Sequence, residues 1–310
     1  MPQASSIKRV SRALLVLGAV MCAGAVAPHE RLGELNYRML PEASGMGVSP
    51  SIDGRLWFIN DAGNRPELIG LDLPDFNYKK IKVKGVRNRD WEDLEVFQLD
   101  GQAWIAVADI GDNLAVRKQV SIYLFPEPPK DSTSVEVFHT IRVEYPGGAR
   151  DSESLAVDPI SRHIYVLSKR DKPPILYRVP LPDLTKSGRS EIVAEQLGEV
   201  SSIPEPTALE MRLFPKYGKY RNQPTSLSLA PDGRTIAIMT YGEAYVTELG
   251  KDRNWLIALN QELCALGSPL LAQPETIAVD EAGSVYLSSE RKQAPLIRMS
   301  SVCAEGAKAD

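Results

Sequence analysis

Glu42-Ala-Ser-Gly-Met-Gly-Val48 is the first of five seven-residue segments that align with one another along the chain. The other four are Asp90-Trp-Glu-Asp-Leu-Glu-Val96, Asp151-Ser-Glu-Ser-Leu-Ala-Val157, Gln223-Pro-Thr-Ser-Leu-Ser-Leu229 and Gln273-Pro-Glu-Thr-Ile-Ala-Val279. Each opens with an acid or an amide, carries an acid or a hydroxyl residue two positions later, and continues as an alternating apolar run. The copies are 48, 61, 72 and 50 residues apart. Such steps are typical of β-propeller blades and are too long for ankyrin or tetratricopeptide repeats.

A turn and further β-rich runs follow each segment. Four of the turns contain glycine, at residues 54, 101, 233 and 283, and glycine supplies the positive φ that tight hairpin turns need. The second β-rich runs are Leu56–Ile59, Trp104–Val107, Ile164–Leu167, Ile236–Met239 and Val285–Leu287. Fourth strands are expected at 78–83, 137–144 and 191–194. Short strands between turn signals, without a long helical period, predict an all-β fold.

The two ends of the repeat array indicate a closed ring. The last repeat has three recognisable strands, and a lone strand-like run, Leu35–Leu40, precedes the first repeat. If that run is the missing strand of the last blade, an N-terminal strand closes the ring. We therefore predict a single β-propeller of five blades, with residues 196–222 as an inserted loop. A sixth, degenerate blade around Pro206–Met211 is the alternative.

The first 27 residues have the features of a signal peptide. Lys8, Arg9 and Arg12 precede an apolar run and small residues, which is the order of a secretory signal. We expect periplasmic or secreted protein, with residues 28–303 forming the propeller domain and 304–310 a polar tail. Met21 precedes Cys22, which disfavours a lipoprotein. The apolar run is too short for a stable membrane span, so we expect none in the mature chain.

Two cysteines remain after export, Cys264 and Cys303. An even pair in an oxidising compartment predicts a disulfide. With 310 residues, 43% of them hydrophobic, the chain can form one full core. The net charge of −4 disfavours nucleic acid and anionic membrane surfaces as partners, and we expect a monomer.

Three motifs resemble a known family. Asn88-Arg-Asp-Trp-Glu-Asp93, Asp109-Ile-Gly-Asp-Asn113 and Asp151-Ser-Glu-Ser-Leu155 are similar to those of a largely uncharacterised family of secreted bacterial β-propellers, over roughly residues 41–299. The resemblance implies fold and export, and it implies no reaction. A looser similarity to calcium-dependent gluconolactonase-like and phytase-like propellers rests on acids around the ring entrance, without any full motif of those families.

Propeller topology would bring the acids of the repeats to one end of the central channel. The predicted metal ligands are Glu42, Asp90, Glu92, Asp109, Asp112, Asp151, Glu153 and Glu275. So many carboxylates in one concavity stay protonated or require a cation, and oxygen ligands favour Ca²⁺. The alternative is a network of ion pairs with Arg89, Lys169, Arg170 and Arg291.

Basic and aromatic residues near these acids predict a ligand site. The residues concerned are Arg89, Trp91, Lys169, Arg170 and Tyr241. The basic ones favour an anionic ligand. The sequence therefore predicts a propeller that binds a small anionic ligand, a glycan or a protein.

An enzyme remains the alternative, namely a metal-dependent hydrolase of lactones, phosphoesters or glycans. In that reaction Asp151 or Glu153 would act as the base. The three histidines, His29, His139 and His163, lie away from the predicted mouth, which disfavours a histidine triad or a zinc site.

Overall fold

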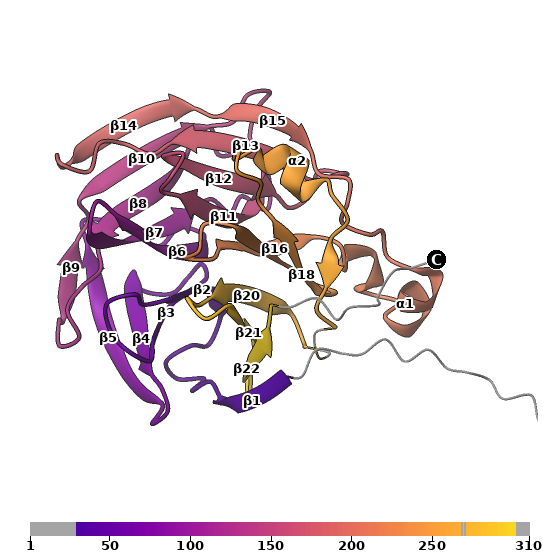
Figure 1. Cartoon of the computed structure of the whole chain (residues 1–310), viewed down its shortest axis with the longest axis horizontal. Coiled ribbons are helices and arrows are strands. Elements are labelled where there is room, and N and C mark those ends of the chain that lie inside the picture. Colours follow the sequence, from indigo (N-terminus) through magenta and orange to yellow (C-terminus); the bar gives the residue numbers. More distant parts are fainter. Residues whose placement is uncertain (1–28, 268, 270, 302–310) are drawn as a thin grey trace, which may run out of the picture.

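Five β-sheets form a ring in the computed structural model of the chain (Figure 1). The structure describes residues 29–267, 269 and 271–301. Residues 1–27, the predicted signal peptide, lie outside the described residues, as do Cys303 and the predicted tail 304–310. The export and the Cys264–Cys303 disulfide therefore stay predictions. Each sheet has one of the five repeat segments as an edge strand. The predicted five-bladed, all-β propeller is confirmed.

The blades follow one another along the chain. The first contains β2 (Ala43–Val48), β3 (Arg55–Asn60), β4 (Glu67–Asp72), β5 (Asn77–Lys84) and β9 (Ser134–Glu136). The second contains β6 (Trp91–Leu99), β7 (Gln102–Asp109), β8 (Val120–Pro126), β10 (His139–Glu144) and β14 (Gly188–Val193). The third contains β11 (Ser152–Asp158), β12 (His163–Ser168), β13 (Ile175–Pro180) and β15 (Glu195–Glu199). The fourth contains β16 (Pro224–Leu229), β17 (Thr235–Thr240), β18 (Ala244–Glu248) and β19 (Cys264–Ala265), and the fifth contains β20 (Pro274–Val279), β21 (Ser284–Ser289), β22 (Pro295–Ser300) and β1 (His29–Glu34).

An N-terminal strand closes the ring, but it lies earlier than predicted. β1 pairs antiparallel with β22, with His29 opposite Met299, whereas residues 35–40 contain no strand. The backbone N–H groups of Met39 and Leu40 both donate to the carbonyl of Asn36, at 2.9 Å. Leu35 and Leu40 are buried. The apolar run therefore anchors a turn in the core, which the sequence pattern alone does not distinguish from a strand.

Two outer strands, β9 and β14, do not join the blade that precedes them in the chain. Each pairs instead with the outer strand of the blade before that one. β9 follows β8 of the second blade but pairs in parallel with β5 of the first. β14 follows β13 of the third blade but pairs in parallel with β10 of the second. The predicted fourth strand of the third blade at 191–194 was therefore wrong, because β15 takes that place. These exchanges join neighbouring blades at the rim.

Residues 200–223 connect the third blade to the fourth and contain α1 (Ala208–Leu213) and the 3₁₀ helix η1 (Gly218–Tyr220). Residues 196–199, which we placed in an insertion, are part of β15. Thr207 and Glu210 cap the start of α1 reciprocally. Arg221 binds the Glu210 carboxylate at 2.8 Å and the Gly242 carbonyl at 2.9 Å, which ties the connection to the fourth blade. No sixth sheet forms among the described residues.

The hydrophobic core is divided among the five boundaries between blades. The fifth residue of each repeat is buried in a different boundary cluster: Met46, Leu94, Leu155, Leu227 and Ile277. Burying one such side chain contributes about 1.5–3 kcal/mol. The remaining helix, α2 (Trp255–Leu259), covers the boundary between the third and fourth blades, where Trp255 stacks on Tyr165 at 4.1 Å. The repeat thus supplies the contacts that assemble the ring.

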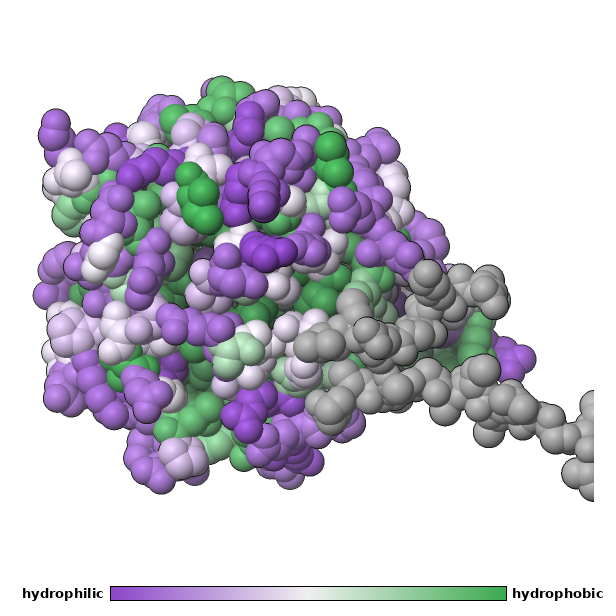
Figure 2. Space-filling view, viewed as in Figure 1, coloured by the Kyte–Doolittle hydropathy of each residue, from purple (hydrophilic) through white to green (hydrophobic). Residues whose placement is uncertain are grey.

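The surface of the ring is mixed. Figure 2 shows one face, on which hydrophobic residues are scattered among hydrophilic ones. No helix in the described part of the chain is long and apolar enough to cross a membrane.

Candidate metal centre at the channel mouth

A β-bulge interrupts each of the five inner strands at the same repeat position. The pairing register shifts between the second and fourth residues of every repeat. A bulge leaves one residue out of the ladder and redirects its side chain. The five residues concerned are polar and buried: Ser44, Glu92, Glu153, Thr225 and Glu275. This end of the ring, where the repeats begin, is called the channel mouth below.

Two of the bulged residues link neighbouring inner strands. The Ser44 hydroxyl donates to the Glu92 carbonyl at 2.7 Å. The Thr225 hydroxyl donates to the Pro274 carbonyl at 2.9 Å. The other three bulged residues are glutamates, so this geometry concentrates carboxylates in a buried ring.

One part of the mouth, the lysine side, consists of Glu153, Lys169, Tyr241 and Glu275. The Lys169 ammonium contacts the Glu153 carboxylate and donates to the Tyr241 hydroxyl at 2.9 Å. Tyr241 also hydrogen-bonds Glu275. Burial lowers the pKa of Lys169, but the Glu153 and Glu275 carboxylates outweigh it and raise that pKa above its usual value. Lys169 is therefore a resident cation of the mouth.

The other part, the acid side, consists of Asp61, Asp90 and Glu92. Each offers one carboxylate oxygen, and these three oxygens lie within 4.8 Å of one another. Asp61 directly follows β3, Asp90 directly precedes β6, and Glu92 is the second residue of β6. Asn88 fixes this meeting, because its amide donates to the Asp61 carbonyl at 2.8 Å and accepts from the N–H of Trp91 at 3.1 Å. The first motif thus joins two blades at the cluster.

Nearby cations compensate the acid side only in part, because the charge of Lys169 on Asp61 and Glu92 and that of Arg117 on Asp90 do not outweigh the effect of burial on these pKa values. Among the ion pairs of the described residues, none includes Asp61, Asp90 or Glu92. Burial, then the charge of Asp61, raises the pKa of Asp90 to about 6. Burial also raises the pKa of Glu92 well above its ordinary value, with further contributions from Glu153 and Asp61. These carboxyls therefore bind protons or a cation more readily than isolated carboxyls do.

Gly111 closes over the acid side. A Cβ atom at this position would lie 2.1 Å from Oε1 of Glu92 and 2.6 Å from Oδ2 of Asp90. Its N–H donates to the Asp90 carbonyl at 3.2 Å. The glycine of Asp109-Ile-Gly-Asp-Asn113 thus permits a backbone approach that any side chain would block.

The predicted ligands Asp109, Asp112 and Asp151 have partners within the protein. Asp109 forms an ion pair with Arg117 at 2.7 Å. The Asp112 carboxylate accepts the N–H of Arg117 at 2.6 Å. Asp151 accepts the N–H of Asp112 at 2.8 Å and pairs with Arg170 at 2.5 Å. The structure places all three near the mouth but holds them in an arginine network.

Two further acids border the mouth. Glu42 is exposed and accepts a hydrogen bond from Asn64 at 2.7 Å. Burial raises the pKa of Glu290 to about 7, and the charges of Asp61 and Glu42 add to this. Glu290 lies in the turn after β21, so the fifth blade contributes two carboxyls, Glu275 and Glu290, to the mouth.

The predicted ligand-binding residues have different environments. Arg89 is exposed, and the Arg170 side chain is 44% exposed, so both can reach a ligand. Lys169 and Tyr241 belong to the lysine side. Trp91 is fully buried between the first and second blades, 6.2 Å from the Tyr123 ring, so its ring supports the core.

Sequence reasoning missed Asp93 and Glu95. The buried Asp93 carboxylate accepts the N–H groups of Leu155 at 2.7 Å and Leu227 at 3.0 Å. Its oxygens thereby join the second, third and fourth blades. Glu95 accepts the N–H of Leu229 at 3.1 Å. The available signal was that only the second repeat has acids at its fourth and sixth positions, where the other repeats have glycine, serine, threonine or alanine.

Comparison with known proteins leaves the family and the function of this chain open. No protein-family profile matches the chain, and no curated protein matches it. Similar solved structures include soluble aldose sugar dehydrogenase from Escherichia coli in the apo form, with 12% identity over 89% of this chain and 100% of that chain and a TM-score of 0.49. Virginiamycin B lyase from Staphylococcus aureus has 10% identity over 88% and 99%, with a TM-score of 0.41. Both neighbours are β-propellers, but similarity this low carries no inference about activity, and the specific family suggested by the motifs stays a prediction.

Proposed function

We propose that the protein is an exported, ligand-binding β-propeller whose acid side holds a Ca²⁺ ion. The observation that carries the proposal is the group of three carboxylate oxygens, from Asp61, Asp90 and Glu92, within 4.8 Å of one another. Ca²⁺ takes six to eight oxygen ligands in flexible geometry. Waters or ligand oxygens would complete the shell. The order of charged, apolar and small residues over 8–27 supports export.

An anionic group is the ligand chemistry that this mouth fits best. A bound Ca²⁺ would attract a carboxylate or phosphate of the ligand. Arg170 offers a second contact, because its side chain is 44% exposed although it pairs with Asp151. Arginine and a divalent cation together recognise oxyanions with directed hydrogen bonds and charge.

The test is a metal analysis of protein purified from its host, followed by thermal unfolding with chelator and with added Ca²⁺. Ligand binding to the folded state raises its stability by mass action. We expect bound calcium and a melting temperature that rises with Ca²⁺ in the wild type and not in Glu92→Gln. An unchanged wild-type melting curve without copurifying metal would reduce the site to hydrogen bonds and ion pairs.

Export has a test of its own. Amino-terminal sequencing of the protein from its host should start near Val26 or Pro28, and an intact Met1 would contradict export.

A metal-dependent hydrolase is the second candidate, and Glu153 favours it. Its Oε2 atom is buried and has no hydrogen-bond partner among the described residues. Burial raises the pKa of Glu153 to about 7, although the charge of Lys169 opposes this. A carboxylate with such a pKa suits a general base near neutral pH. With a lactone and phosphoester panel, turnover that Glu153→Gln abolishes without weakening Ca²⁺ binding would support this candidate, and no turnover would leave the binding protein.

A further inference from the structure

The opposite end of the ring contains a cavity of about 1120 Å³, called the far cavity below. It is lined by the last residue of every repeat: Val48, Val96, Val157, Leu229 and Val279. The turns that follow these strands form its rim. The same repeat that begins with acids at the mouth therefore ends in an apolar ring at the far cavity.

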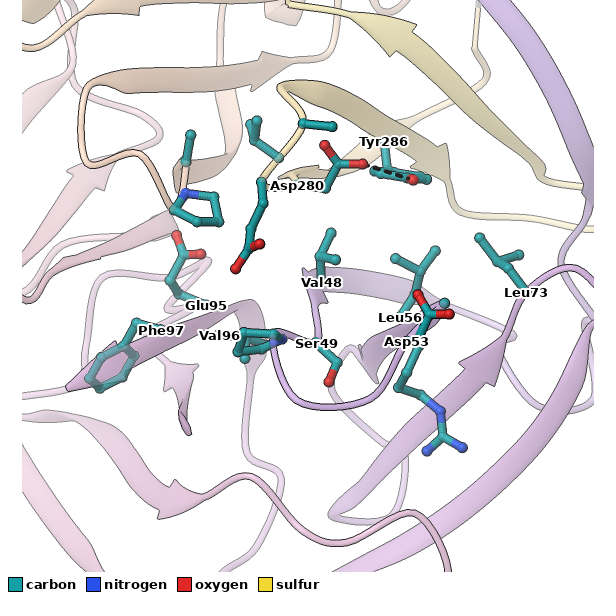
Figure 3. A pocket seen from close by; sticks show the side chains of 18 of the residues that line it. Val48, Ser49, Asp53, Leu56, Leu73, Glu95, Val96, Phe97, Asp280 and Tyr286 are labelled. Carbon is teal, nitrogen blue, oxygen red and sulfur yellow. Dashed lines mark hydrogen bonds between the residues drawn. The ribbon is translucent and has the colours of Figure 1, made fainter. Parts of the chain in front are cut away.

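The walls have the character of a small-molecule site. Phe76, Phe97 and Tyr286 add aromatic surface to the apolar ring. Figure 3 shows Val48, Val96 and Phe97 with Glu95 and Asp280 around one open space. Ligand sites are typically concave and mostly apolar, with a few polar groups and volumes of several hundred Å³. The far cavity has this composition, and its size fits an organic molecule.

The charges that line the far cavity are unbalanced. Each lining arginine already has a carboxylate partner: Arg31 binds Glu34 at 2.5 Å, Arg55 binds Asp72 at 2.6 Å and Arg298 binds Glu30 at 2.6 Å. Four lining carboxylates, Asp53, Glu95, Asp280 and Glu281, belong to no ion pair among the described residues. Burial raises the pKa of Glu95 well above its ordinary value, so the excess of negative charge within the apolar walls comes from Asp53, Asp280 and Glu281.

Two of the four carboxylates are held in place. Oε2 of Glu95 accepts the N–H of Leu229 at 3.1 Å, and Glu95 is only 4% exposed. Asp280 accepts the N–H of Ser284 at 2.7 Å and the hydroxyl of Tyr286 at 3.1 Å (Figure 3). A carboxylate has about four acceptor sites. Both groups thus keep capacity for a further donor.

We propose that the far cavity binds an organic cation, an amine with an aromatic or aliphatic body. The ammonium group would donate to Glu95 or Asp280, and the body would lie on the apolar ring and on Phe97. An ammonium near Phe97 or Tyr286 would also be attracted to the aromatic face. An anionic ligand would be repelled by the unpaired carboxylates, and a bare metal ion would leave the apolar walls uncovered. This site goes beyond the Ca²⁺ proposal and shares none of its three carboxylates.

The test uses three probes with one body, measured by calorimetric titration of the full mature chain. The probes are 4-phenylbutylamine, 4-phenylbutanol and 4-phenylbutyrate, which are cationic, neutral and anionic at pH 7.5. We expect the amine to bind at least about tenfold more tightly than the carboxylate, with the alcohol in between. Equal affinities, an order that favours the carboxylate, or no amine binding would overturn the proposal.

Variants locate the binding. Asp280→Asn should weaken amine binding about tenfold, while Asp183→Asn, an exposed change outside the far cavity, should leave it unchanged. If Asp280→Asn does not fold, Asp53→Asn combined with Glu281→Gln changes two exposed rim carboxylates and should weaken binding in the same direction. Glu92→Gln should have no effect on the amine, since it changes the opposite end of the ring. Loss of amine binding in Glu92→Gln alone would assign the amine to the channel mouth and overturn the proposal.

Discussion

The lysine side and the acid side of the mouth both contain a glutamate at the bulged repeat position, yet the two glutamates face groups of opposite charge. On the lysine side, Glu153 faces the ammonium of Lys169. On the acid side, Glu92 faces Asp61 and Asp90. One side contains its own cation, whereas the other forms no ion pair among the described residues and has carboxyls with raised pKa values. The mouth thus combines a fixed charge, the ammonium of Lys169, with a variable one, the carboxyls of the acid side, whose charge changes with pH or with a bound ion.

The largest expected effect concerns the fixed charge. Lys169→Met keeps a side chain of similar length but leaves Glu153 and Glu275 buried without their cation. Breaking a buried pair in this way costs about 3–5 kcal/mol. Urea unfolding at pH 7.5 measures the loss, with Lys82→Met, a change of an exposed lysine on β5, as the matched control.

A double variant sharpens this result. Adding Glu153→Gln to Lys169→Met should recover part of the lost stability, because the unpaired carboxylate is removed. A loss below about 1 kcal/mol in Lys169→Met would show that the lysine side is not compensated as we describe.

The pH dependence of stability probes the variable charge. The folded-state pKa values of Asp90, about 6, and Glu290, about 7, lie above their ordinary values of 3.8 and 4.5. The folded protein therefore holds more protons than the unfolded chain between about pH 4 and pH 7. The stability from protonation is complete below that window and is lost as the pH rises through it.

Allowing for solvent screening of these half-buried groups, we expect chelated protein to lose about 2 kcal/mol between pH 5 and pH 7.5. Urea unfolding in chelator at the two pH values provides the measurement. Asp90→Asn with Glu290→Gln should flatten the profile. A wild-type stability that rises with pH over this range would contradict the electrostatic account.

A smaller effect is expected from a change beside the acid side. Gly111→Ala would place a methyl group against Glu92 and Asp90. The buried Glu92 carboxylate must shift to relieve this clash, so we expect some loss of stability, and Ca²⁺ should bind about tenfold more weakly, or about 1.4 kcal/mol. Gly188→Ala on β14 is the control, since its Cβ would make an ordinary contact of 3.5 Å with His139. Unaltered Ca²⁺ affinity in Gly111→Ala would show that the ion does not bind beside Asp90 and Glu92.

The smallest effect is expected at Glu42. This predicted ligand is exposed and bound to Asn64. Glu42→Gln should change the free energy of Ca²⁺ binding by less than about 0.5 kcal/mol. A loss as large as that of Gly111→Ala in the same titration would place Glu42 among the ligands after all.

The repeat explains why the fold could be predicted. Its apolar fifth residue, such as Leu94 or Leu155, meets a neighbouring blade in every copy, so periodicity carries the architecture. The ring closure was misplaced because Leu35, Tyr37 and Met39 alternate as in a strand, whereas Leu35 and Leu40 in fact anchor a turn. The exchanged strands β9 and β14 depend on long-range pairing, which a local pattern does not contain.

The site was predictable only in part. The third repeat position indicated Glu92, Glu153 and Glu275, because position and residue type coincide there. The sequence could not show that Arg117, in a loop, holds Asp109. Nor could it show that Asn88 brings Asp61 beside Asp90, because that contact depends on how two blades meet. The far cavity was missed because a valine at the end of a strand is typical of a packed core, so the sequence does not show that these side chains line a cavity.

Direct titration of Ca²⁺ into chelated wild-type and Glu92→Gln protein tests the central claim most directly. Extracellular Ca²⁺ sites have dissociation constants on the order of 10⁻⁴ to 10⁻³ M, so calorimetry should extend beyond that range, with Mg²⁺ as the comparison ion. We predict one saturable Ca²⁺ site in the wild type, weaker binding of Mg²⁺, and loss of at least about a factor of ten in Glu92→Gln. Equal Ca²⁺ binding by the two proteins, or none by the wild type, would contradict the assignment of the acid side as a calcium site.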